Sequence, residues 1–235
     1  MATLATLRTA VSSKLGLDNT AASAEQVLID SWLNQGVLEV LLRTHCTVEP
    51  GTMNTTASTW QYELDTGILA IRNLWREDDN GDVEKSIHLS EQELVDLHRA
   101  SSSSDAAFLH YAVAGSNLLL IWPTPSSVYA MDFLYVPRPT ALTSASHDPS
   151  NAGYGRIPTE FHKAIEYYAL WQGAEFDENT VSGGGERYRA LFEDYVTRFM
   201  RPAITRKGNY ELPRARTRRG AWRTRQTIRR ENDRY

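Results

Sequence analysis

The first 46 residues carry apolar side chains at helical spacing. One side of the first expected helix carries Leu4, Leu7, Val11 and Leu15. Gly16 is suited to end this helix. A second helix is expected from Ser23, because Ser-Ala-Glu-Gln is a capping-box pattern, and its apolar face continues to Leu41. The pattern predicts an antiparallel pair of helices.

The region before the C-terminal tail repeats this helical pattern. Pro158 is placed for the first turn of a helix whose apolar residues continue to Phe176. Residues 177–185 interrupt the pattern with glycines, and residues 186–200 resume it as a last helix. Pro202 is expected to close this part of the chain, so residues 157–202 form a second helical pair.

Between the two helical pairs the period changes to that of strands. Residues 47–58 are rich in Thr, Ser and Gly, and six strands are expected after them: residues 60–64, 68–75, 83–89, 108–114, 117–122 and 128–136. Asn80-Gly81 predicts a type I′ hairpin turn. Ser90 and Glu93 form another capping box, which predicts a short helix. Residues 137–156 have no periodicity and predict a long loop.

These patterns predict an α+β fold: a helical bundle of about four helices, a β-rich insert of about six strands and an extended C-terminal arm. The chain divides into four expected parts: 1–46, an N-terminal helical pair; 47–156, the β-rich insert with one short helix; 157–202, a helical pair packing on 1–46; and 203–235, a basic extended tail. A chain of 235 residues can bury a substantial core in one large or two small domains.

Charge divides the chain into two unequal parts. Residues 201–235 contain twelve Lys or Arg and three Asp or Glu, a net charge of +9. Since the whole chain carries −4, residues 1–200 carry −13. A function for this protein has to account for both an acidic body and a basic tail.

The sequence lacks the motifs that mark common catalytic or metal sites. It contains no phosphate-binding loop, no Gly-x-Ser-x-Gly and no His-Glu-x-x-His. His45 beside Cys46 has no partner pair at zinc spacing, and residues 78–82 lack the later Gly and Glu of a calcium loop. We therefore expect a protein that is not an enzyme and uses no cofactor or metal.

No feature of the sequence indicates a membrane partner or secretion. No apolar run approaches the roughly 18–20 residues of a membrane span. The N-terminus lacks the apolar core of a secretory signal. The single cysteine, Cys46, cannot form an internal disulfide, so folding needs no oxidising compartment. We expect synthesis in a reducing cytoplasm.

The C-terminal helical pair carries more aromatic residues than one buried face requires. They are Tyr167, Tyr168, Trp171, Phe176, Tyr188, Phe192, Tyr195 and Phe199. Packing between the two helices accounts for most of them. The surplus is typical of a surface that contacts a neighbouring subunit, where Tyr and Trp are enriched.

The basic tail has too few aliphatic residues to fold alone, and three interpretations stay open. It could bind nucleic acid, with Arg neutralising phosphates while Tyr210 and Trp222 stack on bases. It could dock on an acidic protein partner, with Pro213, Ile228 and Tyr235 as further anchors. It could be a solubilising terminus. The candidate docking residues are Arg206, Lys207, Tyr210, Pro213, Arg214, Arg216, Arg218, Arg219, Trp222, Arg223, Arg225, Ile228, Arg229, Arg230 and Tyr235.

Several stretches, taken together, resemble the head-to-tail adaptor (neck or connector) proteins of tailed bacteriophages. The helix ending at Gly16 and the helix from Ser23 resemble the start of that family. Later stretches are similar to its strands, exit loop and following helix: Tyr62-Glu-Leu-Asp65, Gly115-Ser-Asn with Pro123-Thr-Pro125, Pro137-Arg-Pro139, and Ile157-Pro158 with His162. The resemblance covers residues 3–200 in the order of the family.

The resemblance implies a structural virion protein of the phage neck, made in the host cytoplasm. It implies a homo-oligomeric ring, usually a dodecamer, that docks on the portal protein and continues the DNA channel. Double-stranded DNA would pass without specific binding, and downstream tail or neck proteins would attach to the ring. The acidic body suits such a channel because like charges repel phosphates. The basic tail would be the portal-docking arm.

The alternative hypothesis comes from another class of protein. It is a nucleic-acid-binding accessory protein that uses the Arg-rich C-terminal tail. The docking hypothesis differs in requiring anchors such as Trp222 to be buried against a protein partner.

Overall fold

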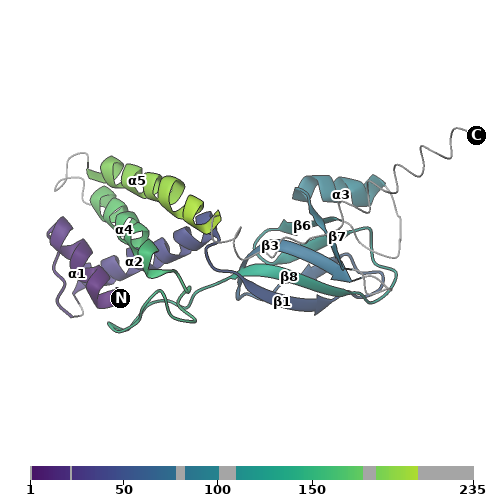
Figure 1. Ribbon diagram of the computed structural model, residues 1–235, viewed down its shortest axis with the longest axis horizontal. Helices are drawn as coiled ribbons and strands as arrows, with labels where there is room; N and C mark the ends of the chain where they lie inside the picture. The colour runs from purple at the N-terminus through teal and green to yellow at the C-terminus, as the bar shows by residue number, and fades with distance from the viewer. Residues whose placement is uncertain (1, 22, 78–82, 101–109, 177–183, 206–235) are drawn as a thin grey trace, which may run out of the picture.

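The computed structural model describes residues 2–21, 23–77, 83–100, 110–176 and 184–205. Figure 1 shows an elongated molecule with helices at one end and strands at the other. We call the first part the helical module and the second the β module. The helical module combines the beginning of the chain with residues 159–205, and the β module lies between them in sequence.

The helical module forms as the capping signals predict. Its elements are α1 (Leu4–Leu15), α2 (Ala24–Thr44), η1 (Thr159–Phe161), α4 (His162–Phe176), α5 (Gly184–Asp194) and η2 (Tyr195–Met200). Gly16 ends α1 with φ of +70°, a conformation that favours glycine. The Ser23 hydroxyl accepts a hydrogen bond from the Gln26 N–H at 3.0 Å and so caps α2.

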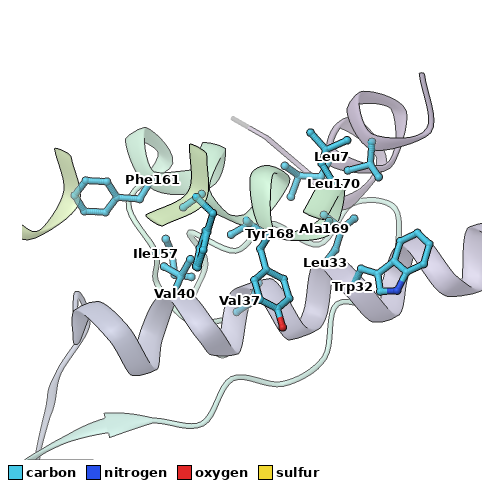
Figure 2. Close-up of a cluster of buried hydrophobic side chains, with 14 of the residues drawn as sticks. Leu7, Trp32, Leu33, Val37, Val40, Ile157, Phe161, Tyr168, Ala169 and Leu170 are labelled. Atoms are coloured by element: carbon cyan, nitrogen blue, oxygen red, sulfur yellow. The ribbon is translucent and has the colours of Figure 1, made fainter. Parts of the chain in front are cut away.

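The core of the helical module lies where α2 and α4 pack on each other, with α1 beside them. Figure 2 shows Trp32, Leu33 and Val37 of α2 turned toward Tyr168 and Ala169 of α4. Because residues from both ends of the chain fill this cluster, the two expected helical pairs are one packing unit.

The β module contains two four-stranded sheets that pack face to face. Its strands are β1 (Glu49–Asn54), β2 (Gln61–Glu63), β3 (Ile68–Glu77), β4 (Val83–Lys85), β5 (Ile87–His88), β6 (His110–Ala114), β7 (Leu118–Trp122) and β8 (Ala130–Pro137). The orders are β1-β8-β3-β4 and β2-β7-β6-β5, and each pairing is antiparallel except β5 with β6. Leu74, Ile121 and Met131 belong to the cluster between the sheets.

Helix α3 (Glu91–Ala100) covers the outer face of the second sheet. Leu94 is fully buried against Ala112, Ala114 and Leu120 of that sheet. The predicted capping box is present, because the Glu93 N–H donates to the Ser90 hydroxyl and the Ser90 N–H donates back to the Glu93 carboxylate. The α+β prediction is confirmed, with eight strands in the described part of the chain where about six were expected.

Tertiary pairing explains the two additional strands. Strand β1 lies inside residues 47–58, where Pro50 and Gly51 weaken the strand signal, yet it pairs with β8 along its full length. The ring of Phe133 lies so close over Gly51 that a Cβ there would stand 2.6 Å from Cε2. The expected strand over residues 83–89 is divided at the buried Ser86, where the chain leaves one sheet and joins the other.

The predicted hairpin after β3 is confirmed as a pairing of β3 with β4, in which Arg76 lies opposite Glu84. The Asn80-Gly81 turn itself lies outside the described residues. The last helix also differs from expectation, because helical backbone continues past Pro202 to residue 205. It passes through the π-helix η2, in which the Arg201 N–H bonds to the Val196 carbonyl five residues back.

Candidate assembly surfaces

The fifteen candidate docking residues lie within 206–235, outside the residues that the structure describes. The geometry therefore tests neither the docking interpretation nor the nucleic-acid interpretation of the tail. What the structure does locate is the helix that leads into it. The described part of the chain ends at Thr205, directly after this helix.

The helix that leads into the tail is anchored near the middle of the molecule. The Tyr195 hydroxyl donates to the Glu160 carbonyl at 2.6 Å, which ties η2 to η1, the turn just before α4. The Arg43 guanidinium donates to Glu193 at 2.5 Å, and Arg201 donates to the Arg43 carbonyl at 3.5 Å. Arg43 lies at the end of α2, just before the chain enters the β module (Figure 1). The tail therefore begins at the junction of the two modules.

Ring contacts account for most of the surplus aromatic residues on α4 and α5. Tyr168 and Phe192 meet edge to face at 5.5 Å between ring centroids, and Tyr167 and Tyr195 meet at 5.9 Å. The expectation that internal packing explains most of these residues is confirmed. Phe176, which is 68% exposed, and Phe199, which is 48% exposed, remain as the surface-facing members.

Polar contacts connect the two modules. The Arg156 guanidinium lies 2.9 Å from the Glu49 carboxylate, which also accepts a hydrogen bond from the Tyr135 hydroxyl at 3.3 Å. The Thr47 hydroxyl donates to the Arg156 carbonyl at 3.1 Å. Arg156 adopts a φ of +49°, which a non-glycine residue adopts only at some cost in energy. These contacts connect the end of the long loop to the start of the β module.

The long loop that was expected over residues 137–156 is held against the helical module. The first N–H groups of α1 donate to this loop, Leu4 to the His147 carbonyl at 2.7 Å and Ala5 to the Ala145 carbonyl at 3.1 Å. The Asn34 side chain on α2 exchanges two hydrogen bonds with the backbone of Leu142, at 2.7 and 3.1 Å. The loop thereby satisfies helix-end donors that would otherwise lack partners.

Glu166 is a buried carboxylate with a structural explanation. It lies 2.5 Å from the Lys14 ammonium and 2.7 Å from the Lys163 ammonium. Burial alone would raise the pKa of Glu166, but the hydrogen bonds from both lysines more than offset burial and lower it below 4.5. The hydrogen bond to Glu166 correspondingly raises the pKa of Lys14. This group is an ionised helix-to-helix connection rather than a general acid or base.

His162 is also buried, with one ring nitrogen satisfied. Its Nε2 lies 3.1 Å from the Ile157 carbonyl and 3.9 Å from the Asp148 carboxylate. Asp148 in turn accepts hydrogen bonds from the backbone and hydroxyl of Ser150. Burial lowers the pKa of His162 below 6.5. In the described part of the chain His162 is therefore a packing residue that these polar contacts hold in place.

Within the described ranges, no group of three or more His, Cys, Asp or Glu could hold a metal ion. His45 ends α2 with φ of +49°, its N–H donating to the Leu41 carbonyl, as expected for a helix-end residue. None of the helices described here is long and apolar enough to cross a membrane.

Sequence reasoning missed the outer face of α2. Val27 is 63% exposed and Leu42 is 44% exposed, with Ser31 and Gln35 exposed and Leu38 half-buried between them. The charged residues of α2 lie on other sides of the helix. The detectable signal is the repeat of uncharged residues at 27, 31, 35, 38 and 42, a second helical stripe beside the core-facing one.

The outer face of α1 is likewise uncharged and consists of small residues. Ala5, Thr6, Thr9 and Ser13 are exposed. The Thr9 hydroxyl donates to the Ala5 carbonyl at 3.0 Å and the Ser13 hydroxyl donates to the Ala10 carbonyl at 3.3 Å. The hydroxyl donors of Thr9 and Ser13 are therefore satisfied inside the helix.

Comparison with known proteins identifies the chain at the level of a family. No curated protein sequence matches it. Among solved structures it is similar to a chain from "Neck of empty GTA particle computed with C6 symmetry", at 16% identity over 79% of this chain and 87% of that chain. The TM-score of that pair is 0.25, too low to decide the fold. The family described as SU10 adaptor protein matches residues 2–227, which include most of the basic tail. The protein, which resembles head-to-tail adaptors in its sequence, belongs to the SU10 adaptor protein family.

Proposed function

We propose that this protein is a structural virion component that joins the head of a tailed phage particle to its tail. The single observation that carries the proposal is the family match over residues 2–227. The body is consistent with a structural part, because its buried ionisable groups at Glu166 and His162 are used for packing. In the proposed particle the protein resides in the neck and has no catalytic role.

The proposed assembly is a ring of identical subunits, usually twelve in adaptors of this kind, placed between the portal protein and the downstream tail or neck proteins. An adaptor ring of this kind continues the channel through which double-stranded DNA passes. The charge of −13 on residues 1–200 favours this role, since an acidic lining repels phosphates and lets DNA slide without specific binding.

The basic tail is proposed to be the arm that docks on the portal. Residues 201–235 carry +9, and the family match extends through most of them. The tail begins beside Arg43, at the junction of the modules, so it can extend past either module. Extended over 30 residues it would reach roughly 100 Å. Trp222 and Ile228 would be the anchors that an electrostatic tether alone would not need.

Deletion of residues 206–235 tests the docking role. The deletion begins after the described helix, so every packing contact between described residues of the helical module is kept. We expect the shortened protein to unfold at the temperature of the full chain but to fail to sediment with tail-less, portal-bearing heads. A second variant, Trp222→Ala with Ile228→Ala, keeps the charge of the tail and should lose most of this attachment. Normal attachment by the shortened protein would contradict the docking role.

The net charge of the tail also favours a second candidate, a nucleic-acid-binding accessory protein. Titration of the free full-length protein with duplex DNA over a salt series separates the two. Phosphate binding through many arginines would give an affinity that falls steeply with salt, by roughly 10³–10⁵ between 50 and 200 mM for six to ten phosphate contacts. The adaptor proposal expects weak binding and attachment to heads that persists at 200 mM salt.

A further inference from the structure

We propose that the β module binds a small oxyanion, a phosphate or carboxylate group, through the guanidinium of Arg76 on β3 and the hydroxyl of Ser86 after β4. Arg76 is 8% exposed and Ser86 is 4% exposed, so both are buried polar residues. The inference goes beyond the adaptor proposal and does not depend on it, because it rests only on contacts within the β module.

The strand register places the two side chains on the same face of the sheet. The Ser86 N–H donates to the Leu74 carbonyl at 2.9 Å, and Arg76 lies opposite Glu84. Opposite residues and alternate residues of paired strands share a face, so Arg76 and Ser86 lie on the face of Leu74. Leu74 belongs to the cluster between the two sheets. Both polar side chains therefore face the inside of the sandwich, where the chain passes from one sheet to the other.

These side chains carry donors that the described residues leave unpaired. Nε and Nη1 of Arg76 and Oγ of Ser86 are buried and have no hydrogen-bond partner in the part of the chain that the structure describes. A buried polar group without a partner costs free energy, and native proteins contain few of them. Three such groups on one face, one of them a permanent cation, indicate an oxygen acceptor with negative charge.

The existing partner of Arg76 occupies only part of its guanidinium. The Glu84 carboxylate accepts from Nη2 at 2.7 Å, and the neighbouring Nε is left without it. A free oxyanion is not tethered to β4, so it can accept from Nη2 and Nε together, as the planar fork of arginine favours. The Ser86 hydroxyl can donate to a further oxygen of the same group.

Glu84 also provides the route of entry. Its side chain is 55% exposed, so its carboxylate can turn into water, where an ion pair contributes little. The carboxylate then leaves the Arg76 guanidinium to the incoming oxyanion. On the other side, Met131 of β8 lies opposite Arg76, is fully buried and supplies no oxygen. Glu84 is thus the competing carboxylate of this site.

Calorimetric titration of the full-length protein with inorganic phosphate, in a buffer without other oxyanions, tests the proposal. Arg76→Met should bind at least tenfold more weakly than the wild type. Arg76→Lys keeps the charge and should also lose most of the binding, because an ammonium lacks the paired donors. Ser86→Ala should weaken binding by roughly 2–10-fold. Glu84→Ala removes the competing carboxylate and should bind at least about fivefold more tightly.

Lys85→Ala is the matched control. It removes the same charge as Arg76→Met, and Lys85 is exposed on the opposite face of β4. This variant should bind phosphate as the wild type does. An equal loss in Lys85→Ala and Arg76→Met would show that phosphate responds only to net charge, and would overturn the proposal. Thermal unfolding in chloride establishes that each variant is folded before it is titrated.

Two further arms identify the ligand. Acetate should compete with phosphate, whereas chloride at the same ionic strength should not. Short duplex DNA should not displace phosphate, because the donors are buried behind β4; displacement by DNA that depends on Arg76 would overturn the assignment to a small oxyanion. Absence of phosphate binding in Glu84→Ala would overturn the site itself. None of these outcomes bears on attachment to portal-bearing heads, so the adaptor proposal stands or fails separately.

Discussion

The Lys14 ammonium and the Glu166 carboxylate meet at 2.5 Å although 152 positions of sequence separate them. Lys14 lies at the end of α1 and Glu166 lies on α4, so the pair connects the beginning of the chain to its last third. Lys163 binds the same carboxylate from the preceding turn of α4. This arrangement holds α1 in place on the core of the helical module.

Glu166→Gln should destabilise the protein by about 1–3 kcal/mol, because it removes charge-assisted hydrogen bonds to two lysines in a buried position. The lysines are 41% exposed and can turn to water, which limits the loss. Urea unfolding followed by circular dichroism measures it. Asp194→Asn, in the exposed pair with Arg198, is the control and should change the free energy of unfolding by less than about 0.5 kcal/mol. Equal effects would contradict the structural role of Glu166.

Stability should fall as the pH drops below about 6.5. Burial holds the pKa of His162 below 6.5, so the unfolded state binds a proton there more readily than the folded state. The nearby Asp148 carboxylate and Ile157 carbonyl act in the opposite direction but do not outweigh burial. The contribution of neutral His162 to the free energy of unfolding is therefore fully present above pH 6.5 and is lost as the pH falls further. The lowered pKa of Glu166 adds a second loss below about pH 4.5.

His162→Gln checks this assignment, since glutamine can donate to the Ile157 carbonyl and does not titrate. Urea unfolding at pH 5.5, 6.5 and 7.5 should show a smaller slope for the variant than for the wild type. A single proton contributes at most about 1.4 kcal/mol per pH unit. Identical slopes for both proteins would show that another group controls stability in this range.

Gly173→Ala should destabilise the protein although alanine favours helices. Residue 173 lies within α4, and a Cβ there would contact Leu15 and would stand 2.9 Å from Cζ3 of the buried Trp32. The gain of about 1 kcal/mol in helix propensity is smaller than the 1–3 kcal/mol expected from overpacking. Thermal unfolding should show a lower Tm.

Gly185→Ala is the matched control for that substitution. Its Cβ would meet Cγ of Glu175 at 2.9 Å, and Glu175 is an exposed side chain that can move. This variant should be neutral or more stable than the wild type. A more stable Gly173→Ala variant would show that Leu15 and Trp32 can repack.

The Arg76–Glu84 pair should respond asymmetrically to mutation. The Arg76 side chain is 9% exposed and Glu84 is 55% exposed, with 2.7 Å between them. Nε and Nη1 of Arg76 are buried and have no hydrogen-bond partner among the residues that the structure describes. Glu84→Ala leaves this guanidinium unpaired and should cost about 1–3 kcal/mol. Arg76→Met removes the buried charge and should be close to neutral or stabilising. Urea unfolding distinguishes them, and an equal loss in both variants would contradict the asymmetry.

Helix ends and periodicity were predictable because their causes are local. Gly16, Ser23 and Ser90 each act on backbone within a few residues, so their sequence signals correspond to observed helix ends. The six expected strands have counterparts in the structure for the same reason. The candidate docking residues were also chosen from local composition, and they lie outside the described chain.

Strand β1 and the α1–α2 faces were not predictable in this way, because long-range partners create them. Pro50 and Gly51 become a strand only by pairing with β8, more than 70 positions away. The outer faces of α1 and α2 are defined by what α4 leaves uncovered.

By itself, the sequence determined the helical caps, the alternation of strands, the division of charge and the resemblance to adaptors. These depend on residue types and short spacings, which do not require knowledge of distant partners. Only the tertiary structure decided which sheet each strand joins, how Lys14 meets Glu166 and which helix faces stay exposed. Those features depend on contacts between residues far apart in the chain, and a one-dimensional pattern does not contain them.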